Sequence, residues 1–209
     1  MENDEILIGI VPVGNVGGQL LDDIIIGVKE VLMHTFNDDD MEKRISCRPI
    51  PPRPTAIPGS AYQENIGKYN VNKFIDLAMT IKSKADRKLN YFGREITKTL
   101  VITNVPLYSL NINSAVFGEA LINGDYAVVS LYQLENNALK EDIRERTIKE
   151  CIHELGHTFG LRHCNEEKCV MRQSLNMYEV DKKSSHFCES CKRQLKSMQF
   201  SKDYGSWKG

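Results

Sequence analysis

The stretch Cys151-Ile-His-Glu-Leu-Gly-His-Thr-Phe-Gly-Leu-Arg-His-Cys164 decides how the rest of this sequence is interpreted. It contains the pattern H-E-x-x-H-x-x-G-x-x-H, and a cysteine follows directly. On an α-helix, His153 and His157 lie one turn apart on the same face, so their two imidazoles can bind one metal ion. Gly160 can adopt a left-handed backbone and end the helix, which allows His163 to return as a third nitrogen ligand.

Three histidines leave one tetrahedral position of a zinc ion open, which is the catalytic and not the structural arrangement. Glu154 follows the first histidine and can reach a zinc-bound water without binding the metal. Such a water has a pKa near about 7, so Glu154 can take its proton and pass it to a leaving amine. The alternative is a solvated helix with two satisfied histidines. Glu150, one turn before His153, is either a partner for a ligand N–H or a solvated carboxylate.

Four cysteines downstream form a second pattern, made of Cys164, Cys169, Cys188 and Cys191. Two close pairs at this separation fit a tetrahedral four-thiolate zinc site, which is structural. The alternatives are two disulfides or a redox C-x-x-C pair. The acidic start of the chain lacks a basic secretory n-region, so we expect a cytoplasmic protein with reduced thiols. The sequence thus predicts two zinc ions per chain, one catalytic and one structural.

The remaining cysteines and histidines carry weaker signals. Cys151 falls on the apolar stripe of the helix and is expected in the core, whereas Cys47 has no partner in sequence. His186 is close to Cys188 and is a rival metal ligand.

Size and composition restrict the protein class. The chain has 209 residues, of which 41% are hydrophobic, which fits one compact domain. A net charge of -1 gives no support for nucleic-acid binding. No apolar run reaches the roughly 20 residues of a membrane span, so we expect no membrane partner.

Periodicity predicts strands and helices that interleave along the chain. Strands are expected at 6–13, 44–50, 99–105, 115–122 and 126–131, and helices at 20–36, 70–84 and 139–160. Pro49 limits the second strand to a sheet edge or a strand end. Asn123-Gly124 between two apolar runs predicts a hairpin. This order is typical of an α/β fold with a twisted mixed sheet and packed helices.

The histidine and cysteine patterns together resemble the archaemetzincins, a family of metzincin-type zinc proteases. The family pattern is H-E-x-x-H-x-x-G-x-x-H-C, four residues, C, one residue, M, a spacer, and C-x-x-C, and this sequence matches it from His153 to Cys191. Met171 then resembles the methionine of the Met-turn, which packs under the catalytic metal. The segment Ala115–Ala120 looks like the family's edge strand.

The resemblance implies a single domain over 1–209 that works as a monomer. Its N-terminal subdomain, 1–160, would end in the active-site helix. Its C-terminal subdomain, 161–209, would be a small zinc-stabilised lobe with the Met-turn and the four cysteines. The edge strand, here about Val116–Ile122, would pair with an extended peptide or protein substrate.

The sequence therefore predicts a zinc metallopeptidase whose natural substrate is not given by the motif. The alternative is a zinc protein that binds peptides or partner proteins with little or no turnover, against which Glu154 argues. A redox protein built on Cys188 and Cys191 is a third interpretation. Tyr178 is a candidate to stabilise the oxyanion, and a packed tyrosine is its structural alternative.

Overall fold

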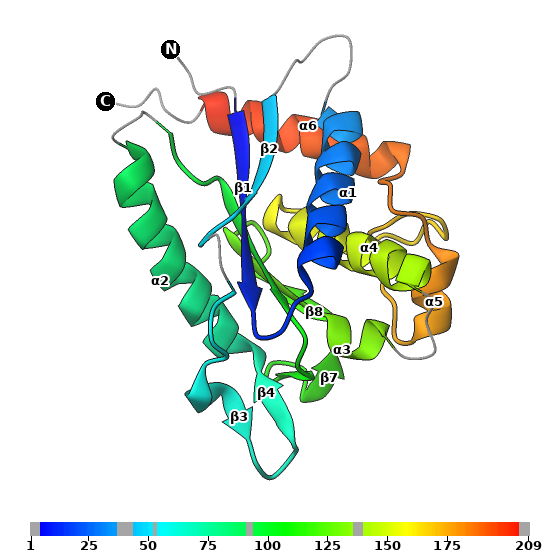
Figure 1. Ribbon diagram of the computed structural model, residues 1–209. Coiled ribbons are helices and arrows are strands. Elements are labelled where there is room, and N and C mark those ends of the chain that lie inside the picture. Colours follow the sequence, from blue (N-terminus) through cyan, green and yellow to red (C-terminus); the bar gives the residue numbers. More distant parts are fainter. Residues whose placement is uncertain (1–4, 37–43, 52–53, 91–93, 136–139, 205–209) are drawn as a thin grey trace.

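The computed structural model describes residues 5–36, 44–51, 54–90, 94–135 and 140–204. These residues form a single mixed α/β domain with a large and a small β-sheet (Figure 1). The large sheet has the strand order β2 (Arg44–Pro49), β1 (Glu5–Val13), β5 (Lys98–Thr103), β9 (Tyr126–Ser130) and β8 (Gly118–Ala120). All neighbours in it are parallel except β8, which runs antiparallel to β9 at the edge.

The small sheet has the order β3 (Tyr62–Gln63), β4 (Lys68–Asn70), β6 (Leu107–Ser109) and β7 (Ser114–Val116). A short 3₁₀ helix, η1 (Gly59–Ala61), precedes β3. In Figure 1 this sheet extends from the lower end of the large sheet. Strand β7 of the small sheet therefore lies next to β8, the edge strand of the large sheet.

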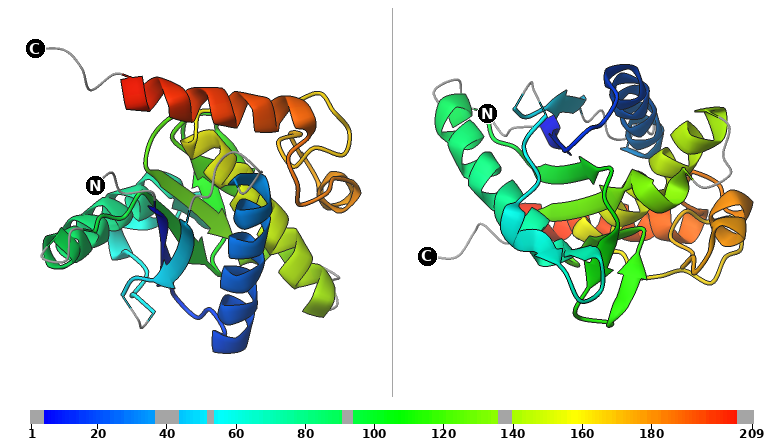
Figure 2. Two further views of the ribbon diagram at one scale, coloured as in Figure 1. Left: turned by 90° about the horizontal axis from the view of Figure 1, so that it is seen from above. Right: turned by 60° about the horizontal axis from the view of Figure 1, so that its bottom comes forward.

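The large sheet is buried on both faces. Ile8 and Ile10 of β1 point into one core, and the odd-numbered Val11 and Val13 point into the other, because side chains alternate along a strand. Helices α1 (Gly18–Phe36) and α4 (Lys140–Thr158) cover the first face, and α2 (Val71–Leu89) covers the second (Figures 1 and 2). Burial on both faces explains why the parallel strands are continuous apolar runs.

The chain after α4 joins the core on the α1 and α4 side. It contains α5 (Met177–Lys182) and α6 (Glu189–Tyr204), while the short α3 (Leu131–Leu134) precedes α4. Met171, Cys191 and Leu195 all pack into that core. Among the described helices, none combines the length and apolar character that crossing a bilayer requires.

The predicted fold class is confirmed, and most predicted elements lie within a few residues of the observed ones. Pro49 ends an edge strand, and Asn123, with a φ of 57°, turns the chain between β8 and β9 as the hairpin prediction requires. The single strand predicted at 115–122 is wrong. Its first part, β7, pairs with β6, and its second part, β8, pairs with β9 in the other sheet. Leu139, the predicted start of the last long helix, lies outside the described residues.

Candidate metal centres and their surroundings

The C-terminal end of α4 turns the chain back toward the helix. Gly160 has a φ of 102°, in the left-handed region that glycine adopts without strain. The N–H of Leu161 donates to the carbonyl of Gly156 at 3.0 Å, and the N–H of Gly160 donates to that of His157 at 2.9 Å. This pair of bonds is the Schellman end of a helix. The predicted role of Gly160 is confirmed, and His163 returns toward the helix.

His153, His157 and His163 meet in one cluster, in which ring nitrogens lie within 4.8 Å of one another. The first two side chains are buried in the helix end, and the third is exposed. The ring centres are 4.7 to 5.3 Å apart. A group of three imidazoles at this spacing can hold one metal ion.

The hydrogen bonds of the two buried rings fix their tautomers. The Nδ1 atom of His153 lies 2.8 Å from the carbonyl oxygen of Val170, and Nδ1 of His157 lies 2.8 Å from that of Leu161. A carbonyl oxygen only accepts, so each Nδ1 carries the proton and each neutral ring has a bare Nε2. These two Nε2 atoms are only 3.2 Å apart. Two lone pairs so close repel each other unless a cation lies between them.

The environment keeps the rings neutral in the absence of a metal. Burial lowers the pKa of His153 well below its usual value, and the nearby Lys183 cation lowers it further. Burial also lowers the pKa of His157 and of His163. Neutral imidazole is the form that binds a metal.

Glu154 lies buried beside the cluster, against the edge strand β8. Burial raises the pKa of its carboxyl well above the usual value, and the neighbouring Glu150 raises it further. A Cβ atom placed on Gly118 of β8 would lie 2.8 Å from Cγ of Glu154 and 2.7 Å from the carbonyl oxygen of Val128. Only glycine therefore lets this strand approach the carboxylate so closely. Gly118 was not predicted as a site residue, although a glycine inside a strand is a sign of close approach.

Met171 is fully buried beneath the histidine helix. A Cβ atom on Gly156 would lie 2.4 Å from Sδ of Met171 and 3.0 Å from the ring of Phe187. Gly156 stands between the two helical histidines, so the sulfur lies directly against that turn. The backbone N–H of Cys164 donates to the carbonyl of Met171 at 2.9 Å, which ties the methionine to the chain after His163.

Cys164, Cys169, Cys188 and Cys191 form the second cluster. The sulfurs of Cys164 and Cys188 are 3.8 Å apart, and those of Cys169 and Cys191 are 3.7 Å apart. A disulfide needs a bond of about 2.05 Å, so these cysteines are free. Four thiolates at 2.3 Å from a tetrahedral zinc ion would be roughly 3.8 Å apart. Burial raises the pKa of the Cys169 thiol to about 11, so this thiolate needs a nearby cation at neutral pH.

Glu150 takes neither of its two predicted roles. Its side chain is buried, and its Oε1 lies 2.8 Å from Nζ of Lys183, whose side chain is 1% exposed. The position that Glu150 was expected to fill beside His153 is taken by the carbonyl of Val170. Lys183 was missed because it lies 33 residues further along the chain, and no spacing rule connects the two.

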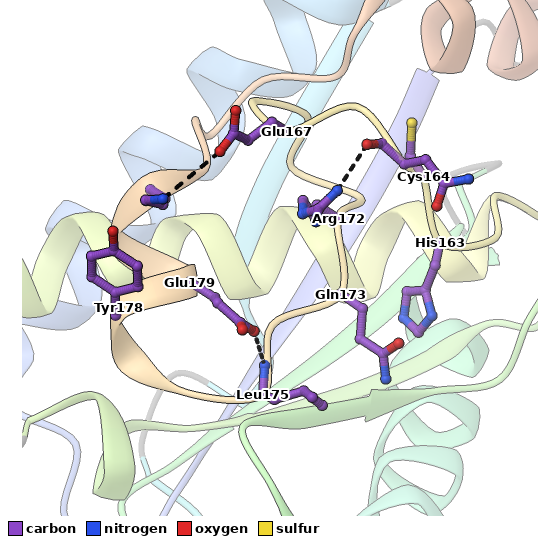
Figure 3. Close-up of a pocket in the computed structure, with 10 residues that line it drawn as sticks. His163, Cys164, Glu167, Arg172, Gln173, Leu175, Tyr178 and Glu179 are labelled. Atoms are coloured by element: carbon purple, nitrogen blue, oxygen red, sulfur yellow. Dashed lines mark hydrogen bonds and ion pairs between the residues drawn. The ribbon is translucent and has the colours of Figure 1, made fainter.

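Two cavities adjoin the histidine cluster. The inner cavity has a volume of about 220 Å³ and lies between β7 and β8 on one side and residues 173–175 on the other, with His153, Glu154 and His163 in its wall. The outer cavity has about 430 Å³ and shares His163, Gln173 and Leu175 with the inner one. Figure 3 shows His163 and Tyr178 at opposite ends of the outer cavity. Tyr178 does not line the inner cavity, so its predicted oxyanion role gains no support from this geometry.

The other residues singled out in the sequence lie apart from these clusters. Cys151 is buried in the core, as predicted. Cys47 packs against the same core without a disulfide. His186 is not part of the cysteine cluster, and its ring instead packs edge-on against that of His34, with centres 5.4 Å apart.

Known proteins resemble this chain over most of its length. A model of peptidase family M54 matches residues 29–197. The archaemetzincin of Haloarcula marismortui is 31% identical over 196 residues, which cover 90% of this chain and 98% of the relative. The crystal structure of archaemetzincin from Methanopyrus kandleri has a TM-score of 0.75 and 28% identity, covering 96% of this chain and 98% of that one. For the Archaeoglobus fulgidus archaemetzincin, complexed with malonate, the TM-score is 0.63 at 29% identity, covering 91% and 99%.

Proposed function

This chain belongs to peptidase family M54 and is a zinc metallopeptidase of the archaemetzincin type, and from this premise we propose how its residues divide the work. His153, His157 and His163 hold the catalytic zinc ion, and Glu154 acts as general base and then general acid. The substrates are peptides or proteins.

The observation that carries this assignment is the pair of bare Nε2 atoms 3.2 Å apart. Both rings are held in that tautomer by backbone carbonyls, so neither can relieve the repulsion by moving its proton. When bound there, zinc would lower the pKa of a water molecule toward about 7 and polarise the scissile carbonyl.

Glu154 provides the proton transfer. Its carboxyl is buried on the wall of the inner cavity, where hydrogen bonds and charges act in a low dielectric. A positive charge in the histidine cluster favours the ionised carboxylate, which offsets the effect of burial on its pKa. Glu154 then accepts a proton from the attacking water and delivers it to the amine that leaves.

The edge strand β8 orients the substrate. It is the last strand of the large sheet, so in the described chain its outer backbone groups face away from β9. An extended peptide adds to this edge through main-chain hydrogen bonds, as strands add to sheet edges elsewhere. Gly118 keeps the distance between this edge and Glu154 short.

The four cysteines hold a second, structural zinc ion, which gives two ions per chain. Sulfur separations of 3.7 and 3.8 Å support this assignment. Met171, packed against Gly156, acts as the Met-turn. We further infer a division into an N-terminal subdomain, 1–160, and a C-terminal subdomain, 161–209.

We infer the cellular location of the enzyme from its cysteines and its oligomeric state from its family. Six cysteines without a disulfide support a reducing, cytoplasmic location. That the enzyme is a monomer rests on the family resemblance alone.

Replacing Glu154 by alanine tests the mechanism. Cleavage of a peptide library by Glu154→Ala is expected to fall at least about a hundredfold below wild type, with the zinc content by mass spectrometry unchanged. Glu145→Ala is the matched control, because Glu145 is an exposed carboxylate on the same helix. Equal cleavage by the wild type and Glu154→Ala would contradict the mechanism.

A further inference from the structure

Building on the proposed function, we propose that the inner cavity selects a lysine or arginine side chain next to the scissile bond, and that Glu150 binds its charged end. The walls of this cavity include His153, Glu154 and His163, the groups that surround the reacting carbonyl. A side chain that enters the cavity therefore belongs to a residue flanking the bond that is cut.

The residues that line the cavity change from apolar where they are exposed to charged where they are buried. At the mouth, Ile112 on the β6–β7 loop and Leu175 on the opposite wall are 65% and 76% exposed. The Glu150 carboxylate, whose side chain is 4% exposed, belongs to the buried part of the same lining. Lysine and arginine match this order, because each has a long apolar stem and a charged end.

The charges of the lining favour a cation over an anion. Glu150 and Glu154 are both part of the wall, whereas none of the described residues that line the cavity is a lysine or an arginine. Lys183 lies behind Glu150 and is outside the lining. Its ammonium lies 2.8 Å from Oε1 of Glu150, and a carboxylate has enough lone pairs to accept hydrogen bonds from a substrate cation as well. An acidic side chain would meet two carboxylates there.

The Glu150–Lys183 pair also holds the opposite wall. Nζ of Lys183 donates to the carbonyl of Arg172 at 3.4 Å, directly before the wall residues Gln173, Ser174 and Leu175. A buried ion pair is costly to desolvate, and a pair of apolar residues would often stabilise a fold as well. A pair at the wall of the substrate cavity is explained if one of its members also binds the substrate.

Selectivity among matched peptides tests this inference. Fluorogenic peptides would carry lysine, arginine, norleucine or glutamate at each position flanking the scissile bond. With the zinc-loaded wild type, kcat/KM for lysine is expected to exceed that for norleucine by roughly tenfold at one flanking position, with glutamate cut most slowly. Ratios within one preparation are independent of the fraction of active enzyme. Glu150→Gln should abolish the preference for lysine and improve cleavage after or before glutamate, because Lys183 is then uncompensated.

Two further variants keep the test sharp. Glu145→Gln removes an exposed carboxylate from the same helix and should leave the ratios unchanged. If Glu150→Gln alone does not fold, the double variant Glu150→Gln/Lys183→Met removes both charges and should prefer norleucine. Equal rates for lysine and norleucine in the wild type, or a preference that survives in the Glu150 variants, would overturn the inference.

Binding measurements distinguish a failure of this inference from a failure of the proposed function. The same peptides bind to zinc-loaded Glu154→Ala without being cut, so fluorescence anisotropy reads the cavity directly. If the lysine peptide binds more tightly than the norleucine peptide and the addition of Glu150→Gln removes this difference, the cavity assignment is supported. This holds even if the wild type cleaves no peptide, and in that case only the peptidase proposal fails. Cleavage by the wild type with equal affinities for the lysine and norleucine peptides would refute the cavity assignment alone.

Discussion

Two glycines determine how closely other groups approach the histidine helix. Gly118 admits Glu154 to the edge strand, and Gly156 admits the sulfur of Met171 to the turn between His153 and His157. In both cases the obstacle to a larger residue is a close neighbour, and no positive φ is involved. The sequence motif predicted the histidine cluster and the carboxylate of Glu154 beside it, but the importance of the two glycines depends on which strand faces the helix, and the motif does not show this.

Adding one methyl group at Gly118 should therefore impair catalysis more than folding. Gly118→Ala places Cβ against a backbone carbonyl and against Glu154, so kcat/KM is expected to fall at least about tenfold while the zinc content stays the same. Gly17→Ala is the control, because its Cβ would meet no atom within 4 Å. Similar kcat/KM values for the two variants would contradict the close approach of β8 and Glu154.

A titrating residue at the far end of the large sheet contributes to stability. Burial alone would raise the pKa of Glu5, but hydrogen bonds from Ser46 and Arg94 outweigh it and lower that pKa below 4.5. Arg94 contacts both carboxylate oxygens, at 2.7 and 3.0 Å. A carboxyl whose pKa is lower in the folded state stabilises the protein above its unfolded pKa, and this stabilisation is lost as the pH falls through the folded value.

We therefore expect the wild type to be more stable than Glu5→Gln by about 1–2 kcal/mol at pH 7. The difference should begin to shrink below pH 4.5 and disappear at lower pH. Urea unfolding of both proteins between pH 3 and 7 measures it, provided that both unfold reversibly across this range. A difference in the free energy of unfolding that does not depend on pH would show that ionisation of Glu5 does not stabilise the folded protein.

At the scale of elements, a backbone hydrogen bond connects the hairpin β8–β9 to the helix α4. The N–H of Asn123 in the hairpin turn donates to the carbonyl of His157 at 2.9 Å. Lys98 of β5 donates to the carbonyl of Gly124 at 2.6 Å and to Asp125 at 3.0 Å. The edge that would receive a peptide and the helix that carries the histidines are thereby held at one distance.

Lys98→Met should loosen this attachment. Because the buried ammonium bonds a backbone carbonyl, its loss is expected to reduce the free energy of unfolding by about 1–3 kcal/mol in chemical denaturation. Asp125→Asn keeps the bond to Gly124 and removes only the partly exposed ion pair, so it should cost less than about 1 kcal/mol. A larger loss for Asp125→Asn than for Lys98→Met would reverse this explanation.

The sequence predicted elements well where one property repeats along a segment, and less well where pairing decides. Continuous apolar runs identified the buried strands, and Gly160 marked the end of the histidine helix. The division of 115–122 into β7 and β8 depends on β6 and β9 as partners, which local pattern does not reveal. The Glu150–Lys183 pair was hidden for the same reason, since only the packing of α5 against α4 brings these two residues together.

At the scale of the whole molecule, the segment after α4 is part of the main core and also carries the cysteine cluster. Cys169 and Cys191 are buried in the same core as α1 and α4. The cysteine cluster begins at Cys164, directly after His163. The stability of the C-terminal segment and the geometry of the histidine cluster are therefore coupled through a short length of chain.

Removing one cysteine should expose this coupling. Cys188→Ser is expected to reduce the zinc content from two ions to one per chain and to lower the melting temperature by about 10 °C, because the binding energy of a structural metal contributes to folding. Cys47→Ser, outside the cluster, should retain both ions. An unchanged zinc content and melting temperature for Cys188→Ser would exclude a structural metal at these cysteines.

Three consecutive residues, Cys169, Val170 and Met171, each make a different contact around the two clusters. The first gives its sulfur to the cysteine cluster, the second gives its carbonyl to His153, and the third packs against Gly156. Extending this tripeptide by one residue would move at least one of the three out of reach. A change of length within the tripeptide should therefore disturb the cysteine cluster and the histidine cluster together, because the two-residue spacing from Cys169 to Met171 sets the position of one cluster relative to the other.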